Sequence, residues 1–384
     1  MISPTLSLNV SHKIHRIAVG SIFFLYGLAF ASWASRIPSI QENLKLSDTM
    51  LGVVLFALPV GLMLSLPLSG WLTTKLGSRK VVIISAFLYS LTLVSLGLAR
   101  EVYQLVGGLF VFGLAGNMLN ISINTQAVGV EALYKRSIMA SFHGLWSLAG
   151  FIGAAVGSFM IGHNIYPFQH FVFILVAAVG VILVSSRFIL PEDINKNENQ
   201  PIFAKPDKSL INLGILAFCS MICEGAMFDW SGVYFRKVVN AENAWMGVGY
   251  TAFMSTMAFG RFFADWLTVR VGLKRILQLS GTLTATGLLV AVLFPYLSTS
   301  IFGFLLVGLG VSSVIPLIYG AAGKSKTMTP GVAIAAVSTI GFLGFLLGPP
   351  VIGLVAGATS LRISFVIIAA MGLCISIVAT RSTL

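Results

Sequence analysis

The stretch GWLTTKLGSRK, residues 70–80, has a counterpart in DWLTVRVGLKR, residues 265–275. Both contain Trp-Leu-Thr, a glycine four positions after the threonine, and a basic pair at the end. The two stretches lie 195 residues apart in a chain of 384 residues. A match at about half the chain length predicts two copies of one structural unit, each with the same short basic loop.

The composition predicts a membrane protein. Hydrophobic residues make up 57% of the chain, charged residues only 9%, and the mean hydropathy is +0.95. A soluble domain carries roughly 25% charged residues, so lipid must cover most of this surface. The net charge of +12 sits in short loops between apolar segments, which is typical of a membrane protein. The sequence has no long basic run with interleaved aromatics, which argues against nucleic-acid binding.

Twelve apolar segments are long enough to cross a bilayer as helices, which needs about 20 residues each. A polar linker at 191–209 follows the sixth and predicts two six-helix halves, 1–190 and 210–384. The fold class is therefore all-α, with twelve transmembrane helices in two pseudo-symmetric bundles. The spans are expected near 17–37, 49–72, 81–99, 102–129, 138–161, 169–190, 210–235, 246–269, 275–294, 298–321, 331–357 and 362–380.

The basic residues predict the orientation in the membrane. Twelve spans place both termini on one side, and the loops on that side hold seventeen of the 24 Lys and Arg residues. The opposite loops hold six. Because cytoplasmic loops are enriched in Lys and Arg, both termini are expected in the cytoplasm.

With these features the sequence resembles the major facilitator superfamily, whose loop after the second helix reads approximately G-x-x-x-D-R-x-G-R-R/K. The acidic residue of that motif falls on Thr74 here. The resemblance implies that the loop gates conformational exchange; alternatively, its basic residues only anchor topology. ASWASRIPSI and EGAMFDWSGVYFR further resemble bacterial fucose-permease-like members, which implies an inner-membrane location. The motif is carried by Gly70, Lys75, Gly77, Arg79 and Lys80, and in the second copy by Arg270, Gly272, Lys274 and Arg275.

Span seven contains two acidic residues, which are costly in lipid and therefore functional candidates. Glu224 and Asp229 are five residues apart, about 140° around a helix, so we expect them not to face one site. Glu224 is the favoured proton-coupling group, because hydration changes the cost of its charged form; Asp229 and His143 are the next candidates. Each can alternatively be a hydrogen-bonded structural residue. Arg261 and Asp265, at i and i+4, are expected to form an ion pair.

A stripe of amides in span four predicts a polar wall. Asn117, Asn120 and Asn124 lie within about 60° of one another around a helix. The resemblance implies that helices one, four, seven and ten line a central cavity, so these amides are candidate substrate ligands. Amides donate and accept hydrogen bonds, which suits a hydroxyl-rich ligand. They can alternatively hold helices together.

Aromatic side chains supply further substrate-binding candidates. Tyr26, Phe30 and Trp33 share one face of span one, and Trp146 lies in span five. Such faces can stack on rings of a solute or can simply pack between helices. Arg36, at the end of span one, is expected to extend to the outer surface.

The sequence therefore predicts a secondary active transporter for a small polar solute, coupled to a proton. Import by symport is favoured, because span five lacks the Gly-Pro pair of the family's drug antiporters. Proton-coupled efflux is the alternative. A membrane enzyme or receptor is a third possibility, which the twofold repeat disfavours. No phosphate-binding loop, dinucleotide motif or zinc-protease motif occurs, and no cofactor, metal site or nucleic-acid partner is predicted. The expected state is a monomer in lipid.

Overall fold

The computed structural model describes residues 11–134, 138–193, 208–323, 325 and 330–381. The regular elements of these residues are helices, as predicted from composition. Their bounds are α1 His12–Asn43, α2 Asp48–Leu55, α3 Ala57–Leu76, α4 Ser78–Leu98, α5 Val102–Tyr134, α6 Met139–Gly162, α7 Pro167–Ser185, α8 Lys208–Lys237, η1 Asn243–Trp245, α9 Val248–Val271, α10 Leu273–Leu293, α11 Leu297–Ser312, α12 Val314–Ala322, α13 Pro330–Ala358 and α14 Leu361–Arg381.

The helices occupy all twelve predicted span positions, which confirms the fold class. α2 and α3 together form the second span, and α11 and α12 form the tenth. Within the described residues, eleven spans are long and apolar enough to cross a membrane. α9 supplies the remaining position with 24 residues. Arg261 and Asp265 lower its hydropathy, because ionisable groups are strongly hydrophilic.

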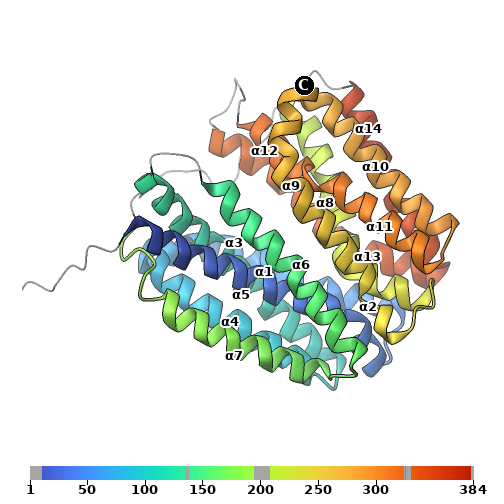
Figure 1. Cartoon of the computed structure of the whole chain (residues 1–384), viewed down its shortest axis with the longest axis horizontal. Coiled ribbons are helices and arrows are strands. Elements are labelled where there is room, and N and C mark those ends of the chain that lie inside the picture. The colour runs from blue at the N-terminus through green and yellow to red at the C-terminus, as the bar shows by residue number, and fades with distance from the viewer. Residues whose placement is uncertain (1–10, 135–137, 194–207, 324, 326–329, 382–384) are drawn as a thin grey trace, which may run out of the picture.

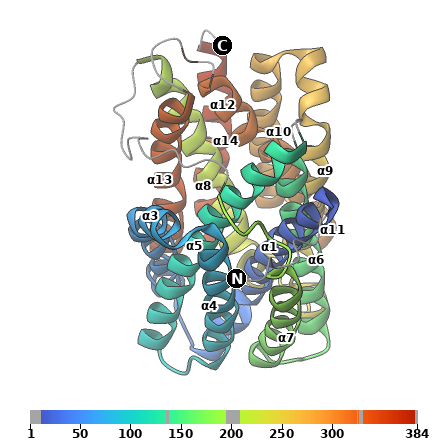
Figure 2. The same ribbon diagram turned by 90° about the vertical axis from the view of Figure 1, so that its left-hand side faces the viewer.

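The helices pack as two bundles that are inclined to one another (Figure 1). In the first, α1 packs on α6, and α5 packs on α3 and α4. In the second, α8 packs on α13, and α10 packs on α11 and α14. Figure 2 shows α8 and α13 standing side by side. The linker expected at 191–209 lies mostly outside the described residues, because 194–207 are not among them.

The repeated loop forms the same turn in both bundles. Gly77 joins α3 to α4 with φ 81° and ψ 147°, and Gly272 joins α9 to α10 with φ 88° and ψ 147°. A side chain is strained at such positive φ values, so glycine is required at this point of each copy. The Gly77 N–H donates to the Thr73 carbonyl, and the Gly272 N–H donates to the Thr268 carbonyl.

The shared tryptophan has the same partner in both copies. The Lys75 ammonium lies 4.7 Å from the ring centre of Trp71, and the Arg270 guanidinium lies 4.2 Å from that of Trp266. Both pairs are cation–π contacts at i and i+4 on exposed helix surfaces. The sequence repeat thus encodes one local structure twice. In each copy a cation stacks on a tryptophan ring at the helix end, and a glycine with positive φ follows.

The two bundles approach closely at one end of the molecule, and α6 of the first bundle also packs along α9 of the second. We call this end the latch end; it carries the connections between α1 and α2 and between α8 and α9. The opposite end carries Gly77 and Gly272, and we call it the loop-motif end. At the latch end a Cβ atom on Gly353 of α13 would lie 2.7 Å from the Cα of Gly52 of α2. A Cβ on Gly232 of α8 would lie 2.5 Å from Pro38 of α1. Glycine therefore allows backbones of opposite bundles to meet.

Candidate functional site

A cavity of about 500 Å³ lies between the two bundles. It is lined from one side by α1, α2, α3, α5 and α6, and from the other by α8, α9, α12 and α13. The first, fourth, seventh and tenth spans all contribute, as the family resemblance implied. Most of the wall is apolar or aromatic, and the groups that can bind a polar ligand are few. The amide, imidazole, carboxylate and guanidinium side chains of its lining are Asn117, Asn120, His143, Glu224, Asp229 and Arg261, and Tyr26 and Tyr319 add phenol hydroxyls.

An ion pair lies in the wall of this cavity. The Arg261 Nη2 of α9 is 3.2 Å from the Glu224 Oε1 of α8. Its Nη1 donates to the Ser147 hydroxyl of α6 at 2.7 Å, so the guanidinium connects the two bundles. The guanidinium also lies 5.8 Å from the ring centre of Trp146. A charge pair of this kind is strong only while both members are ionised, so a proton on Glu224 would weaken the connection.

The expected pairing of Arg261 with Asp265 stays a prediction, because it falls on a side chain outside the described residues. Arg261 contacts Glu224, 37 positions away in sequence. The i, i+4 spacing showed only which residues share a helix face. It gave no information about the carboxylate that α8 presents to α9 across their packing contact.

Asp229 and Glu224 line the same cavity. The expectation that they would not face one site is wrong. An angular separation of about 140° around α8 would keep one of the two carboxylates out of the cavity only if a narrow side of the helix faced it. α8 instead packs against helices of both bundles, α1 on one side and α9, α12 and α13 on the other. The cavity therefore reaches a wide arc of its surface.

The amide stripe is divided between the cavity and the bundle interior. Asn117 and Asn120 line the cavity, and the Asn117 amide donates to the Ser65 hydroxyl at 2.8 Å. Asn124 lies outside the lining, and its amide donates to the Asn120 Oδ1 at 3.0 Å. Because one amide group fixes the orientation of the next, Asn124 positions Asn120.

The aromatic candidates divide in the same way. Tyr26 and Phe30 line the cavity together with Trp146, and His143 lies beside them with its ring centre 5.5 Å from that of Phe23. Trp33 is only 1% exposed and does not belong to the lining. Trp33 shares a helix face with the other two, but toward the latch end the bundles close and this face is covered.

Arg36 does not extend to the surface as expected from its place at the end of a span. It is 2% exposed, and its guanidinium donates to the His170 Nδ1 at 3.2 Å and to the Ile165 carbonyl at 2.6 Å. α1 continues to Asn43, so Arg36 lies well inside the helix and within reach of α7. Its role in the described part of the structure is to tie α1 to the connection before α7.

The loop after span two is fastened to the chain that follows span six. The Arg79 guanidinium donates to the Ser186 carbonyl at 2.9 Å. The backbone N–H of Ser78 donates to an Asp193 oxygen at 2.9 Å, at the N-terminus of α4, where a carboxylate is favourable. The Gln126 amide donates to the Ser78 hydroxyl at 2.6 Å. Asp193 thus places a carboxylate close to the loop motif, in which Thr74 stands at the position of the family's acidic residue.

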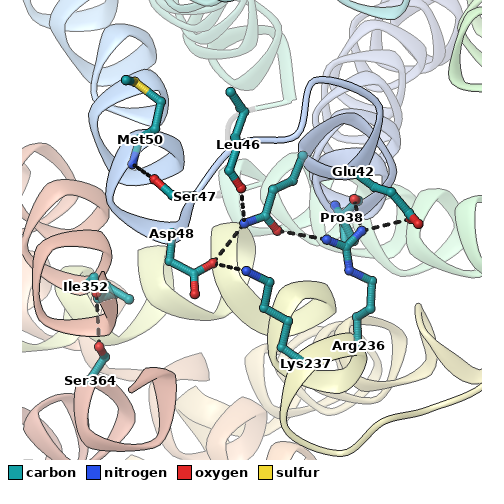
Figure 3. A network of polar contacts seen from close by, with 11 residues as sticks. Pro38, Glu42, Leu46, Ser47, Asp48, Met50, Arg236, Lys237, Ile352 and Ser364 are labelled. Carbon is teal, nitrogen blue, oxygen red and sulfur yellow. Dashed lines mark hydrogen bonds and ion pairs between the residues drawn. The ribbon is translucent and has the colours of Figure 1, made fainter. Parts of the chain in front are cut away.

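A polar network at the latch end joins the bundles, and the sequence did not reveal it (Figure 3). Arg236 of α8 donates to the Pro38 carbonyl and lies 3.1 Å from a Glu42 oxygen, both on α1. Lys237 lies 2.5 Å from the Asp48 carboxylate, which also accepts from the Gln41 amide at 2.8 Å. The only signal in the sequence was the basic pair at the end of span seven, Arg236 and Lys237, and a basic pair does not indicate its partners.

The comparison with protein families explains this architecture. The family model described as "Major Facilitator Superfamily" matches residues 19–327. The chain belongs to the Major Facilitator Superfamily. Members of this superfamily are transporters, not enzymes. The predicted class of function, a secondary transporter in a membrane, is thereby confirmed.

Individual members of the superfamily differ in how similar they are to this chain in sequence and structure. An uncharacterized MFS-type transporter of Yersinia pestis is 31% identical over 95% of this chain and 93% of its own length. Among solved structures, the nucleoside transporter NupG superposes with a TM-score of 0.76 at 14% identity, covering 96% of this chain and 98% of NupG. The Escherichia coli fucose:proton symporter FucP gives 0.63 at 17% identity, covering 98% and 100%. FucP is thus one structural neighbour among several.

Proposed function

We propose that this protein imports a small polar solute together with a proton across the bacterial inner membrane. The observation that carries the proposal is the Glu224–Arg261 pair, which lies in the cavity wall and whose arginine also bonds to Ser147 of the other bundle. One proton on Glu224 can therefore change both the charge of the site and the contact between the bundles. This is the arrangement that coupling a proton to a conformational change requires.

The excess of basic residues in the loops at the loop-motif end supports a cytoplasmic place for that end and for both termini. The latch end would then face the periplasm, and the described state would be closed to the periplasm by the latch network and by the Gly52–Gly353 contact. The basic loop residues, such as Arg79 bound to the Ser186 carbonyl, would restrain the bundle on the cytoplasmic side as it rocks.

The chemistry of the solute follows from the few polar groups of the wall. Asn117 and Asn120 present amides that can bind hydroxyl groups, and Tyr26, Phe30 and Trp146 present rings that can cover a sugar-like or heterocyclic ring. The structural neighbours named for nucleosides and for fucose carry solutes of this polarity, at an identity that shows the fold alone. The alternative is proton-driven export of drugs or metabolites. The largely apolar wall of the cavity favours this alternative.

Uptake by proteoliposomes tests the proposal. Purified protein is reconstituted, a pH gradient is imposed, acid outside, and a library of radiolabelled or mass-detectable polar metabolites is offered. Uphill accumulation that collapses when a protonophore is added is the expected result. Accumulation only when the gradient is reversed would establish export. Uptake that proceeds to equilibrium and ignores the gradient would refute proton coupling.

We expect Asn120→Ala to weaken binding of the transported solute about three- to tenfold, as the loss of one hydrogen bond predicts. Asn124→Ala should have a smaller effect, because it acts by orienting the Asn120 carbonyl oxygen at 3.0 Å. Isothermal titration of purified protein measures both, with the thermal midpoint of each unliganded variant as the control for folding. Equal affinity in wild type and Asn120→Ala would return the amide stripe to a packing role.

A further inference from the structure

The cavity contains two carboxylates whose surroundings differ. Glu224 is paired with Arg261 at 3.2 Å. Asp229 lies one and a half turns further along α8, lines the same cavity and is partly exposed to it. No residue in the described part of the chain donates a hydrogen bond to Asp229 or forms an ion pair with it. One of the two acidic groups is thus compensated within the protein, and the other is not.

The charges of the cavity show what is missing. The charged side chains of the lining are Glu224, Asp229 and Arg261, and the lining also contains one imidazole, that of His143. With neutral histidine the site carries an excess of one negative charge. An uncompensated carboxylate in a poorly hydrated site is costly, and a ligand that brings the opposite charge removes this cost.

Aromatic side chains line the same cavity as this carboxylate, among them Phe30, Phe228 and Phe345. Phe228, next to Asp229 in sequence, makes an edge contact with Phe30 of the opposite bundle at 5.2 Å between ring centres and lies 6.3 Å from Phe345. Tyr250 of α9 makes an edge contact with Phe228 at 6.3 Å, is 1% exposed, and its hydroxyl has no hydrogen-bond partner among the described residues. A cavity that combines aromatic rings with a carboxylate suits an organic ammonium group, because ring faces attract cations.

An inorganic cation fits this site poorly. A calcium-like ion needs about six to eight oxygen ligands, whereas most of the cavity lining is apolar or aromatic. Among the described residues no cluster of three or more metal-ligating side chains occurs. An ammonium group attached to carbon needs only the carboxylate, ring faces and one or two hydrogen-bond acceptors.

We infer that the solute carries a cationic nitrogen, an amine attached to a hydroxyl-bearing or ring skeleton, and that Asp229 is its anchor. This inference rests on the proposed function, because it names the substrate class of the same cavity. Asp229 binds the ammonium group, Phe30 and Phe228 border it, and Asn120 reaches the hydroxyl groups. Glu224 stays with Arg261 and is left for the proton, so the two carboxylates have separate roles.

Binding of matched probe pairs to purified protein in detergent tests the inference without any need for transport. The probes are glucosamine against glucose and cyclohexylamine against cyclohexanol, each at up to about 10 mM, with sodium chloride against potassium chloride as the inorganic arm. A ligand selective for the folded state raises the thermal midpoint, by an amount that grows with the ratio of its concentration to Kd. At least one amine should raise the midpoint by about 2 °C or more, and its neutral partner should not.

Substitutions test whether the amine-specific rise of the thermal midpoint arises from Asp229. Asp229→Asn should abolish the amine-specific shift, Asp229→Glu should restore part of it, and Glu101→Gln, an exposed carboxylate outside the cavity, should retain it. Should Asp229→Asn fail to fold, esterification of wild-type Asp229 by a diazo reagent, which does not couple amines to carboxyl groups, should decrease when the amine is present, as read by mass spectrometry.

Four results would overturn the inference: equal shifts with neutral partners, no shift with any amine, a sodium-specific shift, or loss of selectivity in Glu224→Gln instead of Asp229→Asn. Failure of the proposed function has a different signature. Amine binding would then persist in detergent while proteoliposomes show no response to the proton gradient.

Discussion

Glu224→Gln should abolish uphill accumulation of the solute while leaving downhill exchange intact. With one coupled proton, each pH unit across the membrane supports about a tenfold concentration ratio in the wild type. Glutamine keeps the shape of the side chain and can still accept a hydrogen bond from Arg261, but it cannot bind and release a proton. The accumulation ratio of the variant should therefore fall to about one.

The assay is paired. Counterflow in proteoliposomes measures exchange, and gradient-driven uptake measures coupling, with the solute found by the metabolite screen. Glu101→Gln, which neutralises an exposed carboxylate far from the cavity lining, serves as the control. A Glu224→Gln protein that concentrates solute as well as the wild type would show that coupling lies elsewhere, and His143 would be examined next.

Gly353→Leu should force the latch end open. A Cβ atom at this position would lie 2.6 Å from the Asp48 carbonyl oxygen and 2.7 Å from the Cα of Gly52, both backbone atoms of the opposite bundle. Backbone atoms cannot move aside as a flexible side chain can, so the clash is relieved by separation of α2 from α13. Overpacking of this kind costs about 1–3 kcal/mol, which corresponds to roughly a 5- to 150-fold shift in the equilibrium between the two states.

Reactivity of a cysteine introduced at Leu55, which lines the cavity, measures the opening. A membrane-impermeant maleimide should react faster in Gly353→Leu than in the parent protein, and transport should fall because the closed state is disfavoured. Gly180→Leu is the matched control, because a Cβ atom there meets nothing within 4 Å. Equal reactivity in the parent and Gly353→Leu proteins would mean that this contact does not hold the latch end closed.

Local features of the sequence predicted local structure well. The repeated Trp-Leu-Thr and glycine correspond to one turn formed twice, because a cation at i+4 and a positive φ are properties of a short segment. Eleven of the span positions in the described residues follow from length and hydropathy alone. Glu224 could be selected in the same way, since an acidic residue in the middle of an apolar helix is costly wherever the helix packs.

Contacts between distant helices could not be read from the chain. Periodicity gave the shared face of Tyr26, Phe30 and Trp33, but only packing of the bundles decides that Trp33 lies outside the cavity. The partner of Arg261 lies on another helix, and Arg236 reaches α1 across the interface between the bundles. A periodic pattern carries no information about which helix approaches from outside.

The central claim is that the proton on Glu224 decides which end of the molecule is open. The described state contains the Glu224–Arg261 pair, so it favours ionised Glu224, and acid should shift the population toward a state without the pair.

The most direct test is double electron–electron resonance at about pH 5 and about pH 8 in a protein freed of its native cysteines. One nitroxide pair at Leu76 and Arg275 reports on the loop-motif end, and one at Glu101 and Ser298 reports on the latch end. On acidification the first distance should shorten and the second lengthen in the parent protein, while Glu224→Gln shows the same distances at both pH values. Distances that do not change with pH in the parent protein, or that change equally in Glu224→Gln, would contradict this account.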